Sequence, residues 1–291
     1  MTENNQTADF ITFPKTFEKY RWYKPILVFI IGLIIMIILQ GIILIASSAI
    51  YGGNALSLVS GGYEALNSEL GEIITDLGII MIIPSLYIAT KIVGDRPFSS
   101  YSSSRGGWNF KLFLKALIIP LIALLIYNAV ESAIKGPEGT YHFSILFLIV
   151  SIILVPLQCI AEEYVYRGLI MQTFGSWFKI PVVAILLQAI LFSVSHGYNS
   201  LGLVEIFVSG IVFGFLTWKT NGIEVSSAMH TANNFAISLF VMFGLKSTTS
   251  TPLFNDVVMS IIFDIILCAI MYYVGMKTNW FGEIKENPKN T

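Results

Sequence analysis

Residues 26–50 read ILVFIIGLIIMIILQGIILIASSAI and contain no charged side chain. A helix needs about 20 mostly apolar residues to cross the roughly 30 Å hydrocarbon core of a bilayer, so this stretch is long enough to cross one. A cleaved secretory signal peptide is the alternative, because small residues at 46–49 resemble a cleavage site. The apolar run far exceeds the roughly 7–15 residues of such a signal, which favours a permanent membrane helix.

The composition of the whole chain supports this interpretation. Of its 291 residues, 55% are hydrophobic and 12% are charged, and the mean hydropathy is +0.75. A soluble domain carries about 25% charged residues, so a soluble enzyme, a disordered chain and a secreted disulfide scaffold are excluded. Cys159 and Cys268 both lie in apolar segments and indicate no disulfide framework. The net charge of −1 indicates no nucleic-acid partner. The sequence therefore predicts that the lipid bilayer is a partner of this chain.

The apolar segments predict an all-α fold, a polytopic transmembrane bundle with about eight spans. The spans are expected near residues 26–50, 73–92, 112–131, 141–161, 180–197, 203–218, 224–244 and 256–276. They form a single transmembrane domain, residues 25–278. It follows a polar cytoplasmic N-terminal segment, residues 1–24, and precedes a cytoplasmic tail, residues 279–291. The first 14 residues are polar, and we expect them to be mobile.

The basic residues predict the orientation of the bundle. If the N-terminus is inside, 15 Lys and Arg residues fall on the cytoplasmic side and two, Lys135 and Lys246, fall outside. The positive-inside rule expects this bias, and an odd number of spans would remove it. The sequence therefore predicts a multi-pass cell-membrane protein with both termini in the cytoplasm. Among the 15, Arg167 is also a candidate for a position within a span.

Ionisable side chains inside the spans are the candidate functional residues, because each costs about 2.5–3.5 kcal/mol at a helix centre. Residues 161–168 read AEEYVYRG at the end of the fourth span. On a helix the adjacent Glu162 and Glu163 point about 100° apart, so they cannot share one role. Glu163 and Arg167 are four residues apart and can pair along one face. The alternative is a helix end that emerges into water.

Two of the three histidines lie in similar positions. His196 ends the fifth span in FSVSH, residues 192–196, and His230 begins HTANN, residues 230–234, in the seventh. His230 and Asn234 share a helical face. A single histidine in a span is most often a packing residue. Two histidines, an asparagine and a glutamate pair instead favour a cavity suited to acid–base chemistry. His142 has no polar companion and is interpreted as structural.

EEYVYR, FSVSH and HTANN occur in the order of the motifs EExxxR, FxxxH and HxxxN, and the chain therefore resembles the CPBP family. This family comprises CAAX proteases and bacteriocin-processing or immunity proteins of the Abi type, including type II CAAX prenyl endopeptidases. The resemblance covers roughly residues 156–234, inside a core of about 145–244. It implies an intramembrane endopeptidase that hydrolyses a peptide bond near the membrane interface. The implied substrate is a prenylated CAAX-type tail or a leader or signalling peptide.

The resemblance also implies roles for the motif residues. Glu162 and His196 would hold and activate a water molecule, and His230 and Asn234 would donate to the oxyanion. Glu163 and Arg167 would support the motif helix. The alternative function, from another class, is a bacteriocin-immunity-type membrane interaction protein that acts without essential proteolysis.

Two alternatives to this chemistry remain open in the sequence. Glu162, His196 and His230 have the composition of a catalytic zinc site. There is, however, no HExxH motif and the three lie on separate spans, so we expect no required cofactor, with a divalent metal such as zinc as the alternative. Cys159 lies three residues before Glu162 and could act as a nucleophile with a histidine. Packing is the favoured interpretation of this cysteine.

The predicted topology creates a problem of depth. His196 lies about 25 Å along its helix from the preceding turn, whereas Glu162 ends its own predicted span. The two can meet only if the motif helix continues past Glu162 by a similar length, or if the fifth span starts in the cytoplasm with residues 168–178 as a helical extension. Three further buried charges, Asp76, Glu205 and Asp264, either pair locally or form an ion path. No repeat symmetry supports a transporter.

Overall fold

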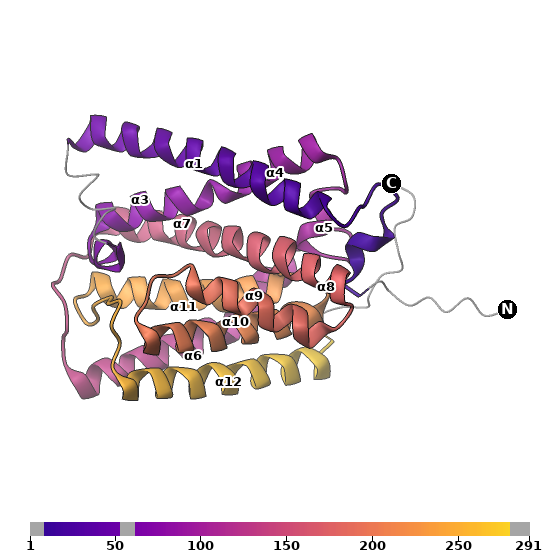
Figure 1. Ribbon diagram of the computed structural model, residues 1–291. Helices are drawn as coiled ribbons and strands as arrows, with labels where there is room; N and C mark the ends of the chain where they lie inside the picture. The colour runs from indigo at the N-terminus through magenta and orange to yellow at the C-terminus, as the bar shows by residue number, and fades with distance from the viewer. Residues whose placement is uncertain (1–8, 53–61, 280–291) are drawn as a thin grey trace.

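The computed structural model describes residues 9–52 and 62–279, and these residues form a bundle of helices (Figure 1). The long helices are α1 (Lys24–Tyr51), α3 (Glu69–Ile80), α4 (Ile82–Val93), α6 (Phe110–Lys135), α7 (Ile145–Glu163), α9 (Pro181–Val194), α10 (Ser200–Thr220), α11 (Glu224–Met242) and α12 (Phe254–Lys277). The shorter elements are η1 (Phe13–Thr16), η2 (Gly62–Asn67), α5 (Ser99–Ser102), η3 (Tyr164–Met171) and α8 (Gln172–Phe178). The predicted all-α fold is confirmed.

Each of the eight expected spans corresponds to one or two helices, which differ in length and polarity. Within residues 9–52 and 62–279, six helical segments are long and apolar enough to cross a membrane. The fifth expected span corresponds to α9, which has 14 residues and is about 21 Å long. The seventh corresponds to α11, whose polar residues exclude it from the six. These two helices carry His196 at an end and His230 in the interior, so the atypical spans are those of the site.

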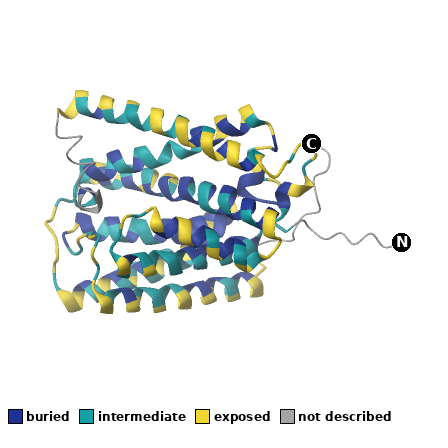
Figure 2. Cartoon of the chain, in the orientation of Figure 1, coloured by how far each residue is buried: buried dark blue, intermediate teal, exposed yellow. Residues whose placement is uncertain are grey.

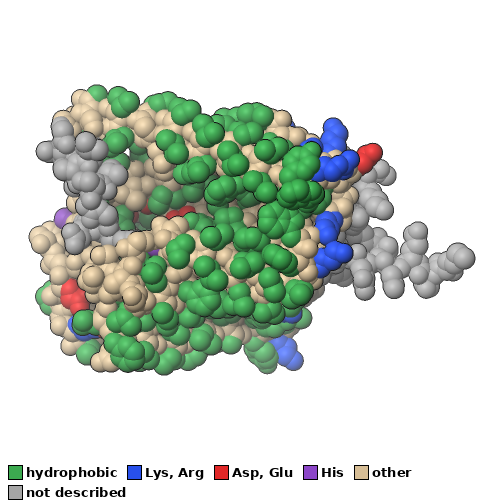
Figure 3. Space-filling view, viewed as in Figure 1, with side chains coloured by type: hydrophobic (Ala, Val, Ile, Leu, Met, Phe, Trp, Pro, Cys, Tyr) green, Lys and Arg blue, Asp and Glu red, His purple; other side chains and the backbone are tan. Residues whose placement is uncertain are grey.

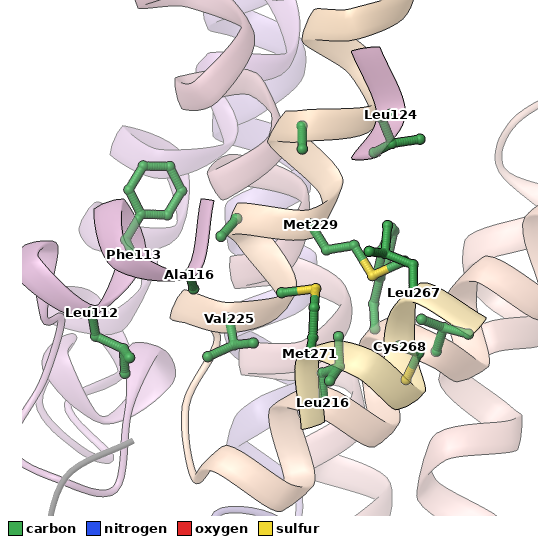
Figure 4. Packing of buried hydrophobic residues seen from close by; sticks show 14 of the residues in the cluster. Leu112, Phe113, Ala116, Leu124, Leu216, Val225, Met229, Leu267, Cys268 and Met271 are labelled. Atoms are coloured by element: carbon green, nitrogen blue, oxygen red, sulfur yellow. The ribbon is translucent and has the colours of Figure 1, made fainter. Parts of the chain in front are cut away.

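The helices pack around α7 and α11. α7 contacts α3 and α11, and α11 also packs along α6. α10 lies between α9 and α12. Figure 1 shows α1 and α4 along one edge of the bundle and α12 along the opposite edge. Figure 4 shows the apolar cluster that packs around α11: Met229 and Val225 lie in one cluster with Ala116 and Leu124 of α6 and with Leu267 and Met271 of α12. This cluster holds the helix that carries His230.

The outer faces of the edge helices are exposed and apolar (Figure 2). On α1, Ile34, Ile37 and Ile38 are each more than half exposed. A contiguous apolar surface of this kind is suited to contact with lipid tails rather than with water. The structure is therefore that of a multi-pass membrane bundle.

Basic side chains are segregated between the two ends of the bundle. Figure 3 shows lysine and arginine side chains at the end that carries α5 and α8. At the opposite end Glu131 accepts from both Lys135 and Lys246, each at 2.7 Å. Which of the two ends faces the cytoplasm stays a prediction from the positive-inside rule. Lys285 and Lys289, in the predicted tail, lie outside the described residues, as do all of residues 280–291.

The N-terminal segment differs from the expectation of mobility. Residues 1–8 lie outside the described part of the chain, but Phe10 and Ile11 are fully buried. The Phe10 N–H donates to Asn221 Oδ1 at 3.2 Å. A Cβ at Gly175 would collide with Ile11, so this glycine makes room for the segment. Two apolar residues within a polar stretch are sufficient to anchor it.

Residues 95–109 connect α4 to α6 and contain α5. This segment contacts both η3 and the start of α11. Tyr101 of α5 is fully buried, and a Cβ at Gly168 would lie 2.5 Å from the Tyr101 carbonyl oxygen. Gly168, the residue after the EEYVYR motif, is therefore needed for α5 to approach η3. The loop also reaches α11, because Arg105 Nη2 lies 2.8 Å from Glu224 Oε2.

Candidate active site

The motif helix resolves the problem of depth. α7 continues without a break through η3 and α8 to Phe178, so 16 residues of helix follow Glu162, about 24 Å. A short turn then leads into α9, and His196 lies 15 residues after Pro181, about 22 Å back. The two similar lengths bring Glu162 and His196 to the same level. Of the two solutions that the sequence allowed, the structure has the continued motif helix.

Glu162 lies between the two predicted histidines. Its Oε2 atom is 3.8 Å from His196 Nε2 and 3.8 Å from His230 Nε2. The Glu162 side chain is 11% exposed and that of His196 is 17% exposed, so a small molecule can reach both. Figure 3 shows a hollow between the layer of α1 and α3 and the layer of α9 and α10, with an acidic side chain at its floor.

The outer nitrogen of each imidazole is already engaged. His196 Nδ1 lies 2.6 Å from the Phe192 carbonyl oxygen, and His230 Nδ1 lies 3.1 Å from Glu163 Oε1. Both partners are acceptors, so each Nδ1 carries a proton. In a neutral ring Nε2 is then an acceptor, and it faces another acceptor, the Glu162 carboxylate. Glu162 Oε2 is buried and has no hydrogen-bond partner among the described residues. A group that donates to these atoms would complete the arrangement.

The predicted pair of Glu163 and Arg167 is present and fully buried. Arg167 Nη1 donates to Glu163 Oε1 at 2.9 Å, and both side chains have no exposure. The guanidinium also lies over the Phe192 ring at 4.3 Å, and its Nη2 donates to the Gly210 carbonyl at 3.4 Å. Because Glu163 Oε1 also accepts from His230, the pair fixes the position of that imidazole.

Gly210 and Gly214 form a GxxxG motif in α10, which explains how α10 comes close enough for this contact. A Cβ at Gly210 would lie 3.0 Å from the Ala189 Cα, and one at Gly214 would lie 2.7 Å from Gln188 Nε2. Gln188 Nε2 donates to the same Gly210 carbonyl at 2.7 Å, so α9, α10 and η3 meet at that atom.

Sequence reasoning missed one member of the site, Gln158. Its Nε2 donates to Glu162 Oε1 at 2.6 Å, and its Oε1 accepts from Asn234 Nδ2 at 3.1 Å. Gln158 therefore joins the glutamate of the first motif to the asparagine of the third. Its position four residues before Glu162, on the same helical face, is its sequence signal, but many other polar residues have a similar spacing. Asn234 Nδ2 also lies 3.4 Å from His230 Nε2.

The structure does not bring the other candidates into the site. His142 Nδ1 contacts the Thr140 carbonyl at 2.9 Å, away from Glu162. Cys159 is fully buried, and its thiol donates to Gln158 Oε1 at 3.2 Å rather than to a histidine. Asp264 Oδ2 accepts from Ser209 at 2.7 Å, which is local pairing. Asp76 is buried, and its Oδ2 has no partner among the described residues.

The spacing of the three metal candidates does not suit a metal ion. Ligand atoms about 2.0–2.1 Å from a tetrahedral zinc lie roughly 3.3 Å apart, whereas Glu162 Oε2 is 3.8 Å from either imidazole nitrogen. Over residues 9–52 and 62–279, no group of three His, Cys, Asp or Glu side chains is placed to hold a metal. As placed, Glu162, His196 and His230 do not fit a zinc centre.

Comparison with known proteins finds a similarity over the part of the chain that carries the site. A family model described as type II CAAX prenyl endopeptidase Rce1-like matches residues 143–236. The chain is also 29% identical over 177 residues to a Bacillus subtilis (strain 168) protein described as uncharacterized protein YyaK. That match covers 56% of this chain and 58% of the relative, so the chain spans less than two thirds of the relative's length. No solved structure matches. Residues 143–236, which contain all three motifs, are therefore related to the Rce1-like type II CAAX prenyl endopeptidases.

Proposed function

We propose that this chain is an intramembrane endopeptidase in which Glu162 activates a water molecule. The observation that carries the proposal is the convergence of Glu162 Oε2 and the two imidazole Nε2 atoms, with 3.8 Å between the oxygen and each nitrogen. A water molecule about 2.8 Å from both Glu162 Oε2 and His196 Nε2 can donate one proton to each. Held in this way, the water is oriented and its protons already point at bases.

The hydrolytic step follows from this placement. Glu162 takes a proton from the water as the water oxygen attacks the scissile carbonyl, and His196 keeps the water in line. The carbonyl oxygen becomes an oxyanion in the tetrahedral intermediate. When the C–N bond breaks, the proton on Glu162 passes to the leaving amine. The products are a carboxylic acid, which keeps the second proton of the water, and an amine, and the enzyme returns to its starting state.

Two groups on α11 are suited to stabilise the oxyanion. Asn234 Nδ2 is a neutral donor at the edge of the site. His230 can donate through Nε2 only as an imidazolium, because its Nδ1 already faces Glu163. In that form it would add a second, charged donor beside Asn234.

The proposed substrate is a peptide or a lipid-modified peptide. A Rce1-like segment supports a CAAX-type tail, and a leader or signalling peptide fits the same chemistry. We propose that no metal is required, since the spacing of Glu162, His196 and His230 does not suit one.

The decisive experiment uses Glu162→Gln and His196→Gln in the full chain, purified and reconstituted in vesicles with a fluorogenic CAAX-type peptide. Each change keeps the side chain's size, or nearly so, and removes the base, so we expect activity to fall by about 10²–10⁴-fold. His142→Gln is the matched control and should keep activity, because His142 contacts only a backbone carbonyl near it. Equal turnover by wild type and Glu162→Gln would contradict the proposal.

A second arm tests the metal and the alternative function. Chelation by EDTA or 1,10-phenanthroline should leave the rate unchanged, and loss restored by zinc would overturn the metal-independent mechanism. If the chain instead acts by interaction alone, an in vivo phenotype should survive Glu162→Gln.

A further inference from the structure

A cavity of about 390 Å³ lies at the lysine-rich end of the bundle, outside the candidate active site. It is lined by Lys15, Tyr20 and Trp22, which precede α1, and by Ser176 and Trp177 of α8. The burial of Phe10 and Ile11 fixes the N-terminal segment against α8 and so builds one wall of this cavity. None of its lining residues takes part in the proposed hydrolysis.

The cavity contains hydrogen-bonding groups that are not used. Ser176 is 1% exposed, and neither its Oγ nor the Tyr20 hydroxyl has a hydrogen-bond partner within the part of the chain that the structure describes. The two hydroxyls lie near each other, and burial raises the pKa of Tyr20, so its phenol keeps the proton and can donate. A buried polar group without a partner is costly, which indicates a ligand that accepts hydrogen bonds.

The charge around the cavity indicates an anion. Lys15 lies within electrostatic reach of Lys179, which ends α8 in the left-handed region with φ 58°. Partial burial, and then the like charge of Lys179, lower the pKa of Lys15. Neither lysine has a carboxylate partner among the described residues, whereas Arg96 nearby is already paired with Asp95. Two adjacent cations with no counter-ion favour a negatively charged ligand.

An apolar groove of about 190 Å³ adjoins this cavity at Trp177, which lines both. It runs between Ile26 and Phe29 of α1, Leu169 and Phe174 of η3 and α8, and Leu191 of α9. Trp177 lines both spaces, and its Nε1 donates to the Trp22 carbonyl oxygen at 3.0 Å. Tryptophan is enriched at the level of lipid headgroups. The cationic pocket, the tryptophan pair and the apolar groove therefore follow one another. They match the headgroup, the interfacial region and the acyl chain of a phospholipid in that order.

We propose that this pocket and groove bind one anionic phospholipid of the lysine-rich leaflet. Its phosphate would lie among Lys15, Lys179, Tyr20 and Ser176, and one acyl chain would lie in the groove beside η3. Anionic lipids are attracted to basic residues at the cytoplasmic surface, the side to which the lysines assign this end. The site does not depend on the peptidase proposal, because it shares no residue with the proposed mechanism.

Native mass spectrometry of the full chain in detergent micelles tests the site. The protein is titrated separately with phosphatidylglycerol and with phosphatidylcholine of the same acyl chains. We expect one phosphatidylglycerol adduct, bound at least tenfold more tightly than phosphatidylcholine. The double variant Lys15→Ala with Lys179→Ala should lose about tenfold or more of this affinity. Replacing both lysines with arginine should keep it, since the charge remains.

A matched control is Lys91→Ala with Lys219→Ala, which removes two lysines whose ammonium groups lie over Tyr87 and Trp218 and outside the cavity. Its affinity for phosphatidylglycerol should equal that of wild type. Equal binding of the two lipids, or equal loss in both double variants, would overturn the proposal. Displacement of the adduct by inorganic phosphate would assign the pocket to a free anion. Displacement by a farnesylated peptide would assign the groove to substrate. Either result also overturns the proposal.

Discussion

α1 and α11 differ in a way that reverses the pattern of soluble proteins. The best window of α1 has a mean hydropathy of 3.1, yet only 11% of it is buried. Fourteen residues of α11 are buried, including Ser226, Ser227, His230 and Thr231, although the helix is too polar to count as a span. In lipid the apolar helix can face outward, and the polar helix must be enclosed by protein. This polar, enclosed helix carries His230 and Asn234 of the candidate site.

The polar groups of α11 and its neighbour α7 are tolerated because most of them have partners. Asn234 and Gln158 bond to each other, and Glu163 accepts from both Arg167 and His230. The lipid-facing residues of α1 have no such partners to lose. Substitutions should therefore have large effects at the α7–α11 interface and small effects on α1.

The largest effect is expected for Arg167→Met. This change leaves Glu163 as a buried carboxylate with His230 as its remaining donor, and breaking a buried pair costs about 3–5 kcal/mol. Thermal unfolding of the purified protein in detergent would measure the loss. The double variant Glu163→Gln with Arg167→Met should recover part of it, because no charge is then left unpaired. An Arg167→Met protein as stable as wild type would show that the buried pair of Glu163 and Arg167 does not stabilise the fold.

Asn234→Ala should have the next largest effect, on catalysis rather than on stability. Loss of one oxyanion donor lowers kcat by about 10²–10³-fold. The KM should change little, because the interaction strengthens only as the oxyanion forms. Steady-state kinetics on the reconstituted protein separate the two parameters. A change confined to KM would instead assign Asn234 to ground-state binding of substrate.

Cys159→Ala should have a small effect on both measurements. The thiol is buried and contacts Gln158, so we expect activity within about twofold and a stability loss of about 1 kcal/mol. A rate assay together with an unfolding curve is sufficient. Near-total loss of activity in a folded variant would replace the glutamate mechanism with a cysteine nucleophile.

The smallest effect is expected on α1, for Ile37→Leu. The side chain is 58% exposed, so its surroundings are lipid and the change should alter stability by no more than about 0.5 kcal/mol. The same unfolding assay applies. A loss comparable to that of Cys159→Ala would mean that this face of α1 packs against protein in the membrane.

Much of this architecture could be predicted from the sequence, because a bilayer narrows the choices. Long, mostly apolar runs must be helical in lipid, and all eight expected segments correspond to helices. The spacing of Glu163 and Arg167 predicted their ion pair, and the order of the three motifs predicted the family relation. Long apolar helices and their charged exceptions are strong signals even in one sequence.

Three features could not be predicted, each for a physical reason. Gln158 is one of many polar residues at helical spacing, and only its distances to Glu162 and Asn234 distinguish it. The packing of Phe10 and Ile11 depends on space beside Gly175, which is created by the fold and not by the segment itself. The continuation of the motif helix past Glu163 was one of two predicted solutions, but the π-helical winding of η3 within it was not predicted.

The continuous helix from Glu162 through η3 and α8 and the returning helix α9 have nearly equal lengths. Glu162 and His196 meet because about 16 residues lead away from one and about 15 lead back to the other. One inserted residue on either side would shift one partner by about 1.5 Å along its helix and turn it by about 100°. The distance between the Glu162 and His196 side chains therefore depends on the number of residues in each of the two segments. This segment should tolerate exchange of many side chains but not a change in its length.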